Sequence, residues 1–180
     1  FWAKTTKTTF PLINARAEGI EKKPSFRSPF RHRRCIIPAS GFFEWKLLEG
    51  HKQPYFVRPA NGGYFAMAGV WDHWQGDDGK TVYSCAIITT EANTMMREIH
   101  DRMPLILELG DLGTWLDPDT EQETALAMLL PYQDGIMEAY PVSSKVNNAK
   151  NNGPDCVARS GSESFRIDQP GVVDGIIKMG

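Results

Sequence analysis

Long apolar runs are absent from this sequence. The strongest candidates are short stretches such as residues 85–88, whereas a helix that crosses a bilayer needs roughly 18 to 20 apolar residues. We therefore expect no membrane span. Cysteine is equally scarce: Cys35, Cys85 and Cys156 are odd in number and lack the spacing of metal ligands. That pattern argues against a disulfide framework and a zinc site, and it favours a reducing, cytoplasmic compartment.

Several common catalytic motifs are also missing. The sequence has no phosphate-binding loop, no dinucleotide fingerprint, no His-Glu-x-x-His and no Gly-x-Ser-x-Gly. The composition is otherwise that of a folded globular domain, with 41% hydrophobic and 23% charged residues in a chain of 180. We place one domain at residues 1–159 and interpret residues 160–180 as a peripheral tail.

Charges of opposite sign are concentrated in different parts of the chain. Residues 1–36 hold nine Lys or Arg against two Glu, a balance of +7, and the remaining residues hold eleven against twenty, a balance of −9. A basic front end can attract a polyanion even when the whole chain is slightly acidic. Folding can equally scatter these charges over a solvated surface. Charge alone leaves both interpretations open.

Strand-like segments dominate the middle of the chain. Apolar and aromatic runs predict β-strands at residues 10–13, 35–38, 41–45, 53–58, 64–71, 81–89 and 105–107. Asn61-Gly62 and Asp78-Gly79 are hairpin signals, so this region predicts a β-meander. Helices are predicted at 91–99, capped by Thr90, at 111–116 and at 121–129, with a helical turn within 22–34. The predicted class is α+β, a curved, mostly antiparallel sheet or open β-barrel with peripheral helices.

Three polar residues stand in surroundings that allow a structural or a functional interpretation. Glu44 alternates away from Phe43 and Trp45 in an aromatic strand, so its carboxylate is either partly desolvated and able to donate a proton, or simply in water at an edge. His100 ends the helix predicted at 91–99, where it is either a positioned acid–base group or a cap. Asn14 follows an apolar run at a turn, a common place for asparagine.

The internal candidates for a nucleophile are poor. Cys35 and Cys85 lie in strand-like apolar runs and are expected in the core, and Cys156 is only modestly better placed. The residues alone therefore predict a basic, aromatic-lined front end, one semi-buried glutamate and a histidine.

Five short motifs occur in a fixed order. They are Leu-Ile-Asn-Ala-Arg-Ala-Glu at 12–18, Pro-Ala-Ser-Gly-Phe-Phe-Glu-Trp at 38–45, Ala-Gly-Val-Trp at 68–71, Ile-His-Asp-Arg-Met-Pro at 99–104, and Tyr-Pro-Val-Ser at 140–143 with Val146-Asn147. In order and spacing they resemble the SOS response-associated peptidase family, over residues 1–157. Five motifs in order are far more specific than any one of them.

The resemblance implies a protein that binds single-stranded DNA, or junctions of single and double strands, and captures abasic sites covalently. The family's attacking group is a cysteine at position two, exposed when the initiator Met is removed. Its α-amine has a pKa of about 7.7–8.0 against about 10.4 for Lys, so more of it is neutral at pH 7, and its thiol can close a Schiff base into a thiazolidine. The sequence opens at Phe1, and we expect the segment with this cysteine to be missing upstream.

By the same resemblance three residues assist the chemistry. Asn14 would hold the terminal aminothiol or the sugar, Glu44 would move protons during Schiff-base formation and reversal, and His100 would assist ring opening and stabilise charge on oxygen. We expect no cofactor and no metal. The family's name also implies an autopeptidase activity, and the expected location is the bacterial-type cytoplasm, with the protein nucleoid-associated when bound to DNA.

Cationic and aromatic side chains are expected to hold the DNA. The resemblance implies that Arg16 binds phosphate and that Trp2 and Trp45 stack on bases or wedge the strand. The other predicted DNA-binding residues, all from the basic front end, are Arg27, Arg31, Arg33 and Arg34.

Two alternative functions stay open. The chain is either a non-enzymatic single-strand binding module, in which basic residues and tryptophans suffice, or a Cys-dependent peptidase that acts on other proteins. The peptidase needs a peptide-sized cleft with oxyanion donors, which the sequence does not identify. A Met-Cys start upstream would favour covalent capture over the binding module.

Overall fold

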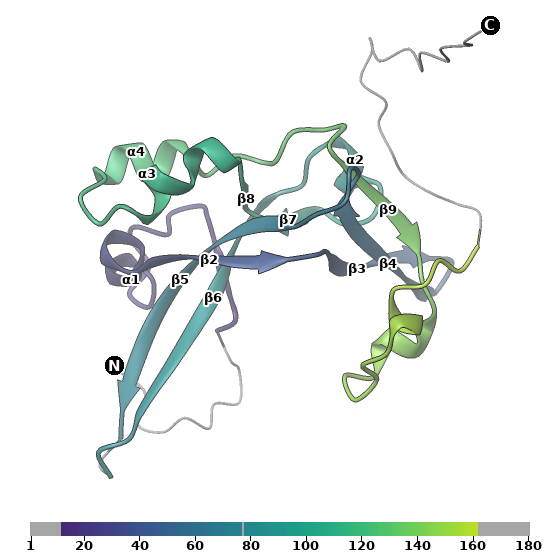
Figure 1. The fold of residues 1–180 in the computed structure, drawn as a ribbon, viewed down its shortest axis with the longest axis horizontal. Coiled ribbons are helices and arrows are strands. Elements are labelled where there is room, and N and C mark those ends of the chain that lie inside the picture. The colour runs from purple at the N-terminus through teal and green to yellow at the C-terminus, as the bar shows by residue number, and fades with distance from the viewer. Residues whose placement is uncertain (1–11, 77, 162–180) are drawn as a thin grey trace, which may run out of the picture.

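The computed structural model describes residues 12–76 and 78–161 (Figure 1). Trp2, the first half of the strand predicted at 10–13, and all but two residues of the predicted tail lie outside this part of the chain. In chain order the elements are β1 (Asn14–Arg16), α1 (Arg27–His32), β2 (Arg34–Ala39), β3 (Phe42–Leu48), β4 (His51–Pro59), β5 (Phe65–Gln75), β6 (Thr81–Glu91), α2 (Thr94–Arg97), β7 (Arg102–Pro104), β8 (Ile106–Leu107), η1 (Leu109–Asp111), α3 (Leu112–Leu116), α4 (Gln122–Ala127), β9 (Met137–Pro141), η2 (Ser144–Asn147) and η3 (Pro154–Cys156).

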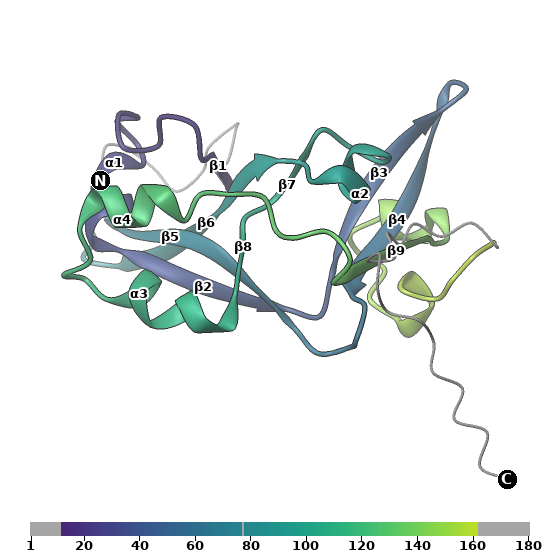
Figure 2. The ribbon, with the colours of Figure 1, turned by 90° about the horizontal axis from the view of Figure 1, so that it is seen from above.

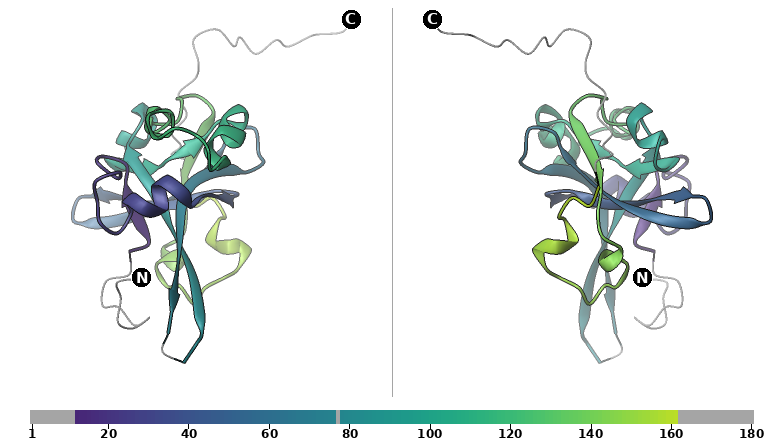
Figure 3. Two further views of the ribbon diagram at one scale, coloured as in Figure 1. Left: turned by 90° about the vertical axis from the view of Figure 1, so that its left-hand side faces the viewer. Right: turned by 90° about the vertical axis from the view of Figure 1, so that its right-hand side faces the viewer.

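The first sheet contains the longest strands. Its order is β1-β6-β5-β2, with β7 beside β6 and β8 beside β5, and every pairing is antiparallel except that of β1 with β6. Strands β5 and β6 form the hairpin predicted from Asp78-Gly79, and this hairpin projects from the body of the molecule (Figure 3). At the other end of the strands Leu105 bridges them, because its N–H donates to Ile88 and its carbonyl accepts from Ala68, both at 2.8 Å.

The second sheet is antiparallel, in the order β3-β4-β9. Only Ser40 and Gly41 separate β2 from β3, so one stretch of chain joins the two sheets. Glycine is needed at position 41 because a β-carbon would lie 2.4 Å from the ring of Phe56 and 2.5 Å from the carbonyl oxygen of Val57. The second sheet and α2 therefore occupy one end of the molecule, and helices α1, α3 and α4 lie at the other end beside the first sheet (Figure 2).

Three apolar clusters follow this layout. The first cluster lies between the first sheet and the helices at its end, and it includes Ala15, Phe30, Ile88, Trp115 and Ala125. The second cluster lies between the two sheets and α2, and it includes Tyr55, Val57, Met67, Met96 and Ile99. The third cluster is smaller and covers the other face of the second sheet, with Phe56, Tyr140 and Val142.

The predicted strand connections and the start of one predicted helix differ in the structure. The meander is wrong, because Asn61-Gly62 carries the chain from the second sheet to the first and β4 does not pair with β5. Gly62 makes this turn at a φ of 77°, a region that favours glycine. The helix predicted from Thr90 starts instead at Thr94, because Thr90 continues β6 opposite Met103. Asn93 caps this helix.

The fold class itself is confirmed as α+β, with a curved, mostly antiparallel sheet and short peripheral helices (Figures 1 and 2). The predicted strand at 10–13 is displaced, since β1 spans Asn14–Arg16. Among residues 12–76 and 78–161, no helix is long and apolar enough to cross a membrane.

Candidate functional site

Strand β1 presents Asn14 and Arg16 on one face of the first sheet. Asn14 lies opposite Ile87 and Arg16 opposite Thr89, and both residues are exposed, whereas Ala15 between them is fully buried in the first cluster. This alternation is the two-residue period of a strand. Because Ile87 packs against the second cluster, Asn14 and Arg16 lie on the side of the sheet that meets that cluster.

Glu44 lies on β3, at the edge of the second sheet. It pairs with Tyr55, a buried member of the second cluster, so its side chain is on the face of the sheet that meets this cluster, as alternation predicts. The residue is half-buried, and its Oε1 accepts the backbone N–H of Trp45 at 3.0 Å. That N–H points away from β4, because the carbonyl of Pro54 opposite already accepts from Val142. The carboxylate is therefore anchored to its own strand.

His100 lies in the turn between α2 and β7. Its Nδ1 accepts the backbone N–H of Arg102 at 3.0 Å and lies 3.2 Å from Oδ1 of Asp101. When the neutral ring accepts this N–H at Nδ1, its proton is on Nε2. When Nδ1 carries a proton, its partners are Asp101 and the carbonyl oxygen of Arg102, which is 3.4 Å away. The side chain is 41% exposed, while the preceding Ile99 is buried in the second cluster. The neutral imidazole is therefore held at Nδ1 and can donate from Nε2.

Each of these three residues lies beside a residue of the second cluster or one packed on it. Asn14 pairs with a residue that packs on this cluster, Glu44 pairs with a member, and His100 follows a member along the chain. They come from three separate segments, namely β1, β3 and the turn after α2. An amide, a carboxylate and an imidazole at the rim of one apolar cluster can bind a polar group and move protons on it.

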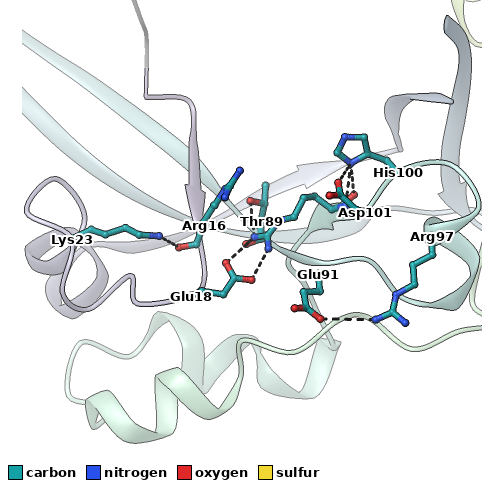
Figure 4. Close-up of polar contacts among 9 residues, drawn as sticks. Arg16, Glu18, Lys23, Thr89, Glu91, Arg97, His100 and Asp101 are labelled. Carbon is teal, nitrogen blue, oxygen red and sulfur yellow. Dashed lines mark hydrogen bonds and ion pairs between the residues drawn. The ribbon is translucent and has the colours of Figure 1, made fainter. Parts of the chain in front are cut away.

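Arg102 links two of these segments and was not identified from the sequence. Its Nη1 donates to Oε1 of Glu18 at 2.5 Å, and its Nη2 donates to Oε2 of Glu18 at 3.0 Å and to the carbonyl of Thr89 at 2.6 Å (Figure 4). The hydrogen bonds from Arg102 lower the pKa of Glu18. The sequence contains one signal for this pair: Glu18 lies in the motif at 12–18, and Arg102 lies in the motif at 99–104.

The basic front end does not gather on the face that carries Arg16. Arg27 and Arg31 are exposed on α1, but this helix packs Phe30 into the first cluster and so covers the opposite face of the first sheet. Arg27 and Arg31 therefore lie on the opposite side of the sheet from Arg16, and the residues predicted to bind DNA do not form one surface.

Arg33 and Arg34 are engaged within the protein. The guanidinium of Arg33 lies 6.0 Å from the ring centre of Trp71 and 3.3 Å from Asp72. Arg34 is buried, and its guanidinium donates to four backbone carbonyls at the ends of α1 and α3, those of Phe30, Arg31, Trp115 and Asp117. Burial also lowers its pKa. The prediction that Arg34 contacts DNA is corrected: this side chain ties two helix ends together.

Trp45 lies on the opposite face of β3 from Glu44. Its indole Nε1 donates to Oδ1 of Asn147, in the 3₁₀ helix η2, at 2.8 Å. The residue is half-buried. A ligand that touches both Trp45 and Glu44 must therefore pass around the free edge of the strand. Asn147 was part of a recognised motif, but its contact joins residues 102 positions apart in the chain and was not foreseen.

The three cysteines differ in their exposure. Cys85 is exposed on the projecting hairpin, and Cys156 is buried, which corrects the prediction for both. Burial, with a smaller effect of Cys85, raises the pKa of Cys35 to about 11, and such a thiol is a weak nucleophile at neutral pH. Across the described ranges 12–76 and 78–161 no group of three or more His, Cys, Asp or Glu is arranged to hold a metal.

A family model described as "SOS response associated peptidase (SRAP)" matches residues 1–149. The chain belongs to this family. The match covers Asn14, Glu44, His100 and the Glu18–Arg102 pair. The fold described above is therefore that of a chain from the SRAP family.

Relatives of this SRAP chain include bacterial and vertebrate proteins. "Abasic site processing protein YoqW" of Bacillus subtilis is 45% identical over 158 residues, which are 87% of this chain and 70% of the relative. "Abasic site processing protein HMCES" of Mus musculus is 33% identical over 182 residues, which cover 85% of this chain and 51% of the relative. The chain thus spans about half the length of the mouse relative.

Solved structures share the architecture of this SRAP chain. A crystal structure of a Bacteroides thetaiotaomicron protein is 35% identical, with a TM-score of 0.77, and the similarity covers 82% of this chain and 65% of that protein. A Bordetella bronchiseptica protein is 29% identical, with a TM-score of 0.67 over 72% of this chain and 64% of that one. The two-sheet arrangement is therefore shared with experimentally determined structures.

Proposed function

We propose that this chain is the part of a DNA damage response protein that captures abasic sites in single-stranded DNA. The observation that carries the proposal is that Asn14, Glu44 and His100 all lie beside residues of, or packed on, the second cluster, with the exposed Arg16 on the same face as Asn14. The names of the relatives, which describe abasic site processing, support this choice of substrate. Arg16 contacts a phosphate, and Trp45 stacks on a base at the edge of β3.

The proposed nucleophile is the N-terminal cysteine that the family resemblance implies. Its α-amine adds to the aldehyde of the opened deoxyribose, and water leaves as the Schiff base forms. The thiol then adds to the carbon of the C=N bond and its proton passes to the nitrogen, which closes a thiazolidine without an oxidant or a reductant. Cys35, Cys85 and Cys156 cannot do this because each lies inside the chain and has no free α-amine.

Each of the three residues has a task in this reaction. Glu44 accepts and returns protons as water leaves and as the Schiff base reverses. His100 donates from Nε2 to the oxygen of the opening sugar, because Arg102 occupies Nδ1 in the neutral ring. Asn14 offers an amide that holds the aminothiol or the sugar. The autopeptidase activity suggested by the family's name stays a prediction.

The test uses the full open reading frame and a single-stranded oligonucleotide with one abasic site. The expected product is a protein–DNA complex that survives denaturing electrophoresis. Replacing the N-terminal Cys by Ser should reduce it strongly, because an oxazolidine closes less favourably, and acetylating the α-amine should abolish it. The 180-residue chain alone should give no such complex. Salt-sensitive binding without any covalent product would instead favour the non-enzymatic binding module.

A further inference from the structure

Arg102 contacts two segments of the candidate site. Its backbone contacts His100, and its side chain contacts Glu18, just after β1. Its N–H donates to Nδ1 of His100 at 3.0 Å, which fixes the imidazole on the turn before β7. Its guanidinium holds Glu18, two residues beyond Arg16 at the end of β1, through two parallel hydrogen bonds (Figure 4). Bidentate arginine–carboxylate pairs fix orientation as well as distance.

Strand β1 is short, and the contact with Arg102 adds to the burial of Ala15 and to its pairing with β6. It has three residues and pairs only with β6 in the described ranges, through bonds such as that from Ala17 N–H to the Thr89 carbonyl at 2.8 Å. Arg102 donates to the same carbonyl at 2.6 Å. The Thr89 carbonyl of β6 therefore accepts hydrogen bonds both from Ala17, just after β1, and from the side chain of Arg102 on β7. Short edge segments with few backbone bonds are the first to open locally.

We propose that Arg102 and Glu18 are positioning residues, which hold the His100 imidazole and the Asn14 and Arg16 side chains in one fixed arrangement. This inference rests on the proposed function for its kinetic test. The competing role for Arg102 is a direct phosphate contact, with Glu18 merely restraining it. The two roles differ in what happens when Glu18 loses its charge.

The kinetic test compares Glu18→Gln with Glu91→Gln in the full-length protein. Glu91 lies opposite Arg102 and has only a long ion pair, 3.9 Å from Arg97, so its variant removes the same charge from the same region without loosening β1. If Arg102 and Glu18 position the site, Glu18→Gln should slow covalent capture roughly 10- to 100-fold relative to Glu91→Gln, because small misplacements of reacting groups cost this much. Glu18→Gln should also bind intact single strands more weakly than Glu91→Gln, because Arg16 is one of the side chains that the pair positions. Tighter DNA binding by Glu18→Gln, with capture at the rate of Glu91→Gln, would overturn the proposal.

A second measurement needs neither DNA nor activity. The ¹⁵N shifts of the His100 ring report which nitrogen carries the proton, and we expect the Nε2–H tautomer to dominate in the unchanged neutral protein. Glu18→Gln and Arg102→Lys should each let the Nδ1–H tautomer appear, while Glu91→Gln should not. An unchanged tautomer in folded Glu18→Gln protein would refute the positioning role. Absence of capture by the unchanged protein would refute the proposed function and leave this test valid.

Discussion

The two faces of the first sheet differ in what they do, and β1 shows the difference within three residues. Ala15 is fully buried and packs with Phe30 and Trp115 under the helices, whereas Asn14 and Arg16 on either side of it are exposed. One face stabilises the fold through apolar contacts. The opposite face packs Ile87 against the second cluster and presents the side chains of Asn14 and Arg16 beside it. Substitutions on the two faces should therefore separate stability from chemistry.

The largest expected effect comes from substituting the proposed catalytic residues. Glu44→Gln and His100→Ala should each slow covalent capture by about 10²–10⁴-fold, the usual contribution of a positioned acid–base group. Asn14→Ala should slow it in the same direction. Affinity for intact single strands should be nearly unchanged, since these groups act on the aldehyde. Single-turnover capture and equilibrium binding measure the two quantities. A parallel loss of non-covalent binding in all three variants would return them to structural roles.

The next effect is on the covered face. Arg34→Met should lower the free energy of unfolding by about 1.5–3 kcal/mol, because it removes hydrogen bonds from a charged group to the ends of α1 and α3. Arg31→Met is the matched control, an exposed arginine on α1 that should change stability by less than about 0.5 kcal/mol. Urea unfolding measures both. Equal stability of the two variants would contradict the structural role of Arg34.

A smaller effect separates the exposed arginines of the two faces. Arg16→Ala should weaken binding to intact and abasic single strands alike, because a phosphate contact carries no information about the lesion. It should also reduce the slope of log K against log salt by about 0.7, the value for one phosphate of a single strand. Arg27→Ala, on the helix that covers the opposite face, should change both quantities less. A salt-independent affinity of the unchanged protein would refute the phosphate contacts altogether.

The smallest effect concerns pH. The hydrogen bonds from Arg102 lower the pKa of Glu18 below its ordinary value of 4.5, so the pair stabilises the fold above about pH 4.5 and this contribution disappears as pH falls through the lowered value. Glu18 is half-exposed, so solvent screening limits the contribution to less than about 1 kcal/mol. The free energies of unfolding of the unchanged protein and of Glu18→Gln should therefore differ at pH 7 and converge as the pH falls below the lowered pKa of Glu18. A difference that persists at low pH would assign the effect to packing.

The sequence predicted the positions of the strands well and the pairing between strands badly. Alternation placed Glu44 on the correct face because the period of a strand is a local property. Asn61-Gly62 predicts a hairpin, but the same residues can also carry a chain from one sheet to another, as they do here. Which strands pair depends on contacts that a turn motif does not encode.

The arginines show the same limit. Arg34 looks like its neighbours Arg31 and Arg33 in the sequence, yet two of its acceptors, the carbonyls of Trp115 and Asp117, lie 81 and 83 residues away. The Glu18–Arg102 pair spans 84 residues. Motif resemblance predicts roles for Asn14, Glu44 and His100, but only the folded chain shows which residues they contact.

The most direct test of the account is to map the covalent bond. The full-length protein is reacted with abasic single-stranded DNA, digested with protease and nuclease, and analysed by tandem mass spectrometry. The account predicts one modified peptide, the N-terminal one, carrying the sugar remnant with loss of one water and with no free N-terminal thiol. A remnant attached to a lysine, or to the peptide of Cys35, Cys85 or Cys156, would contradict it.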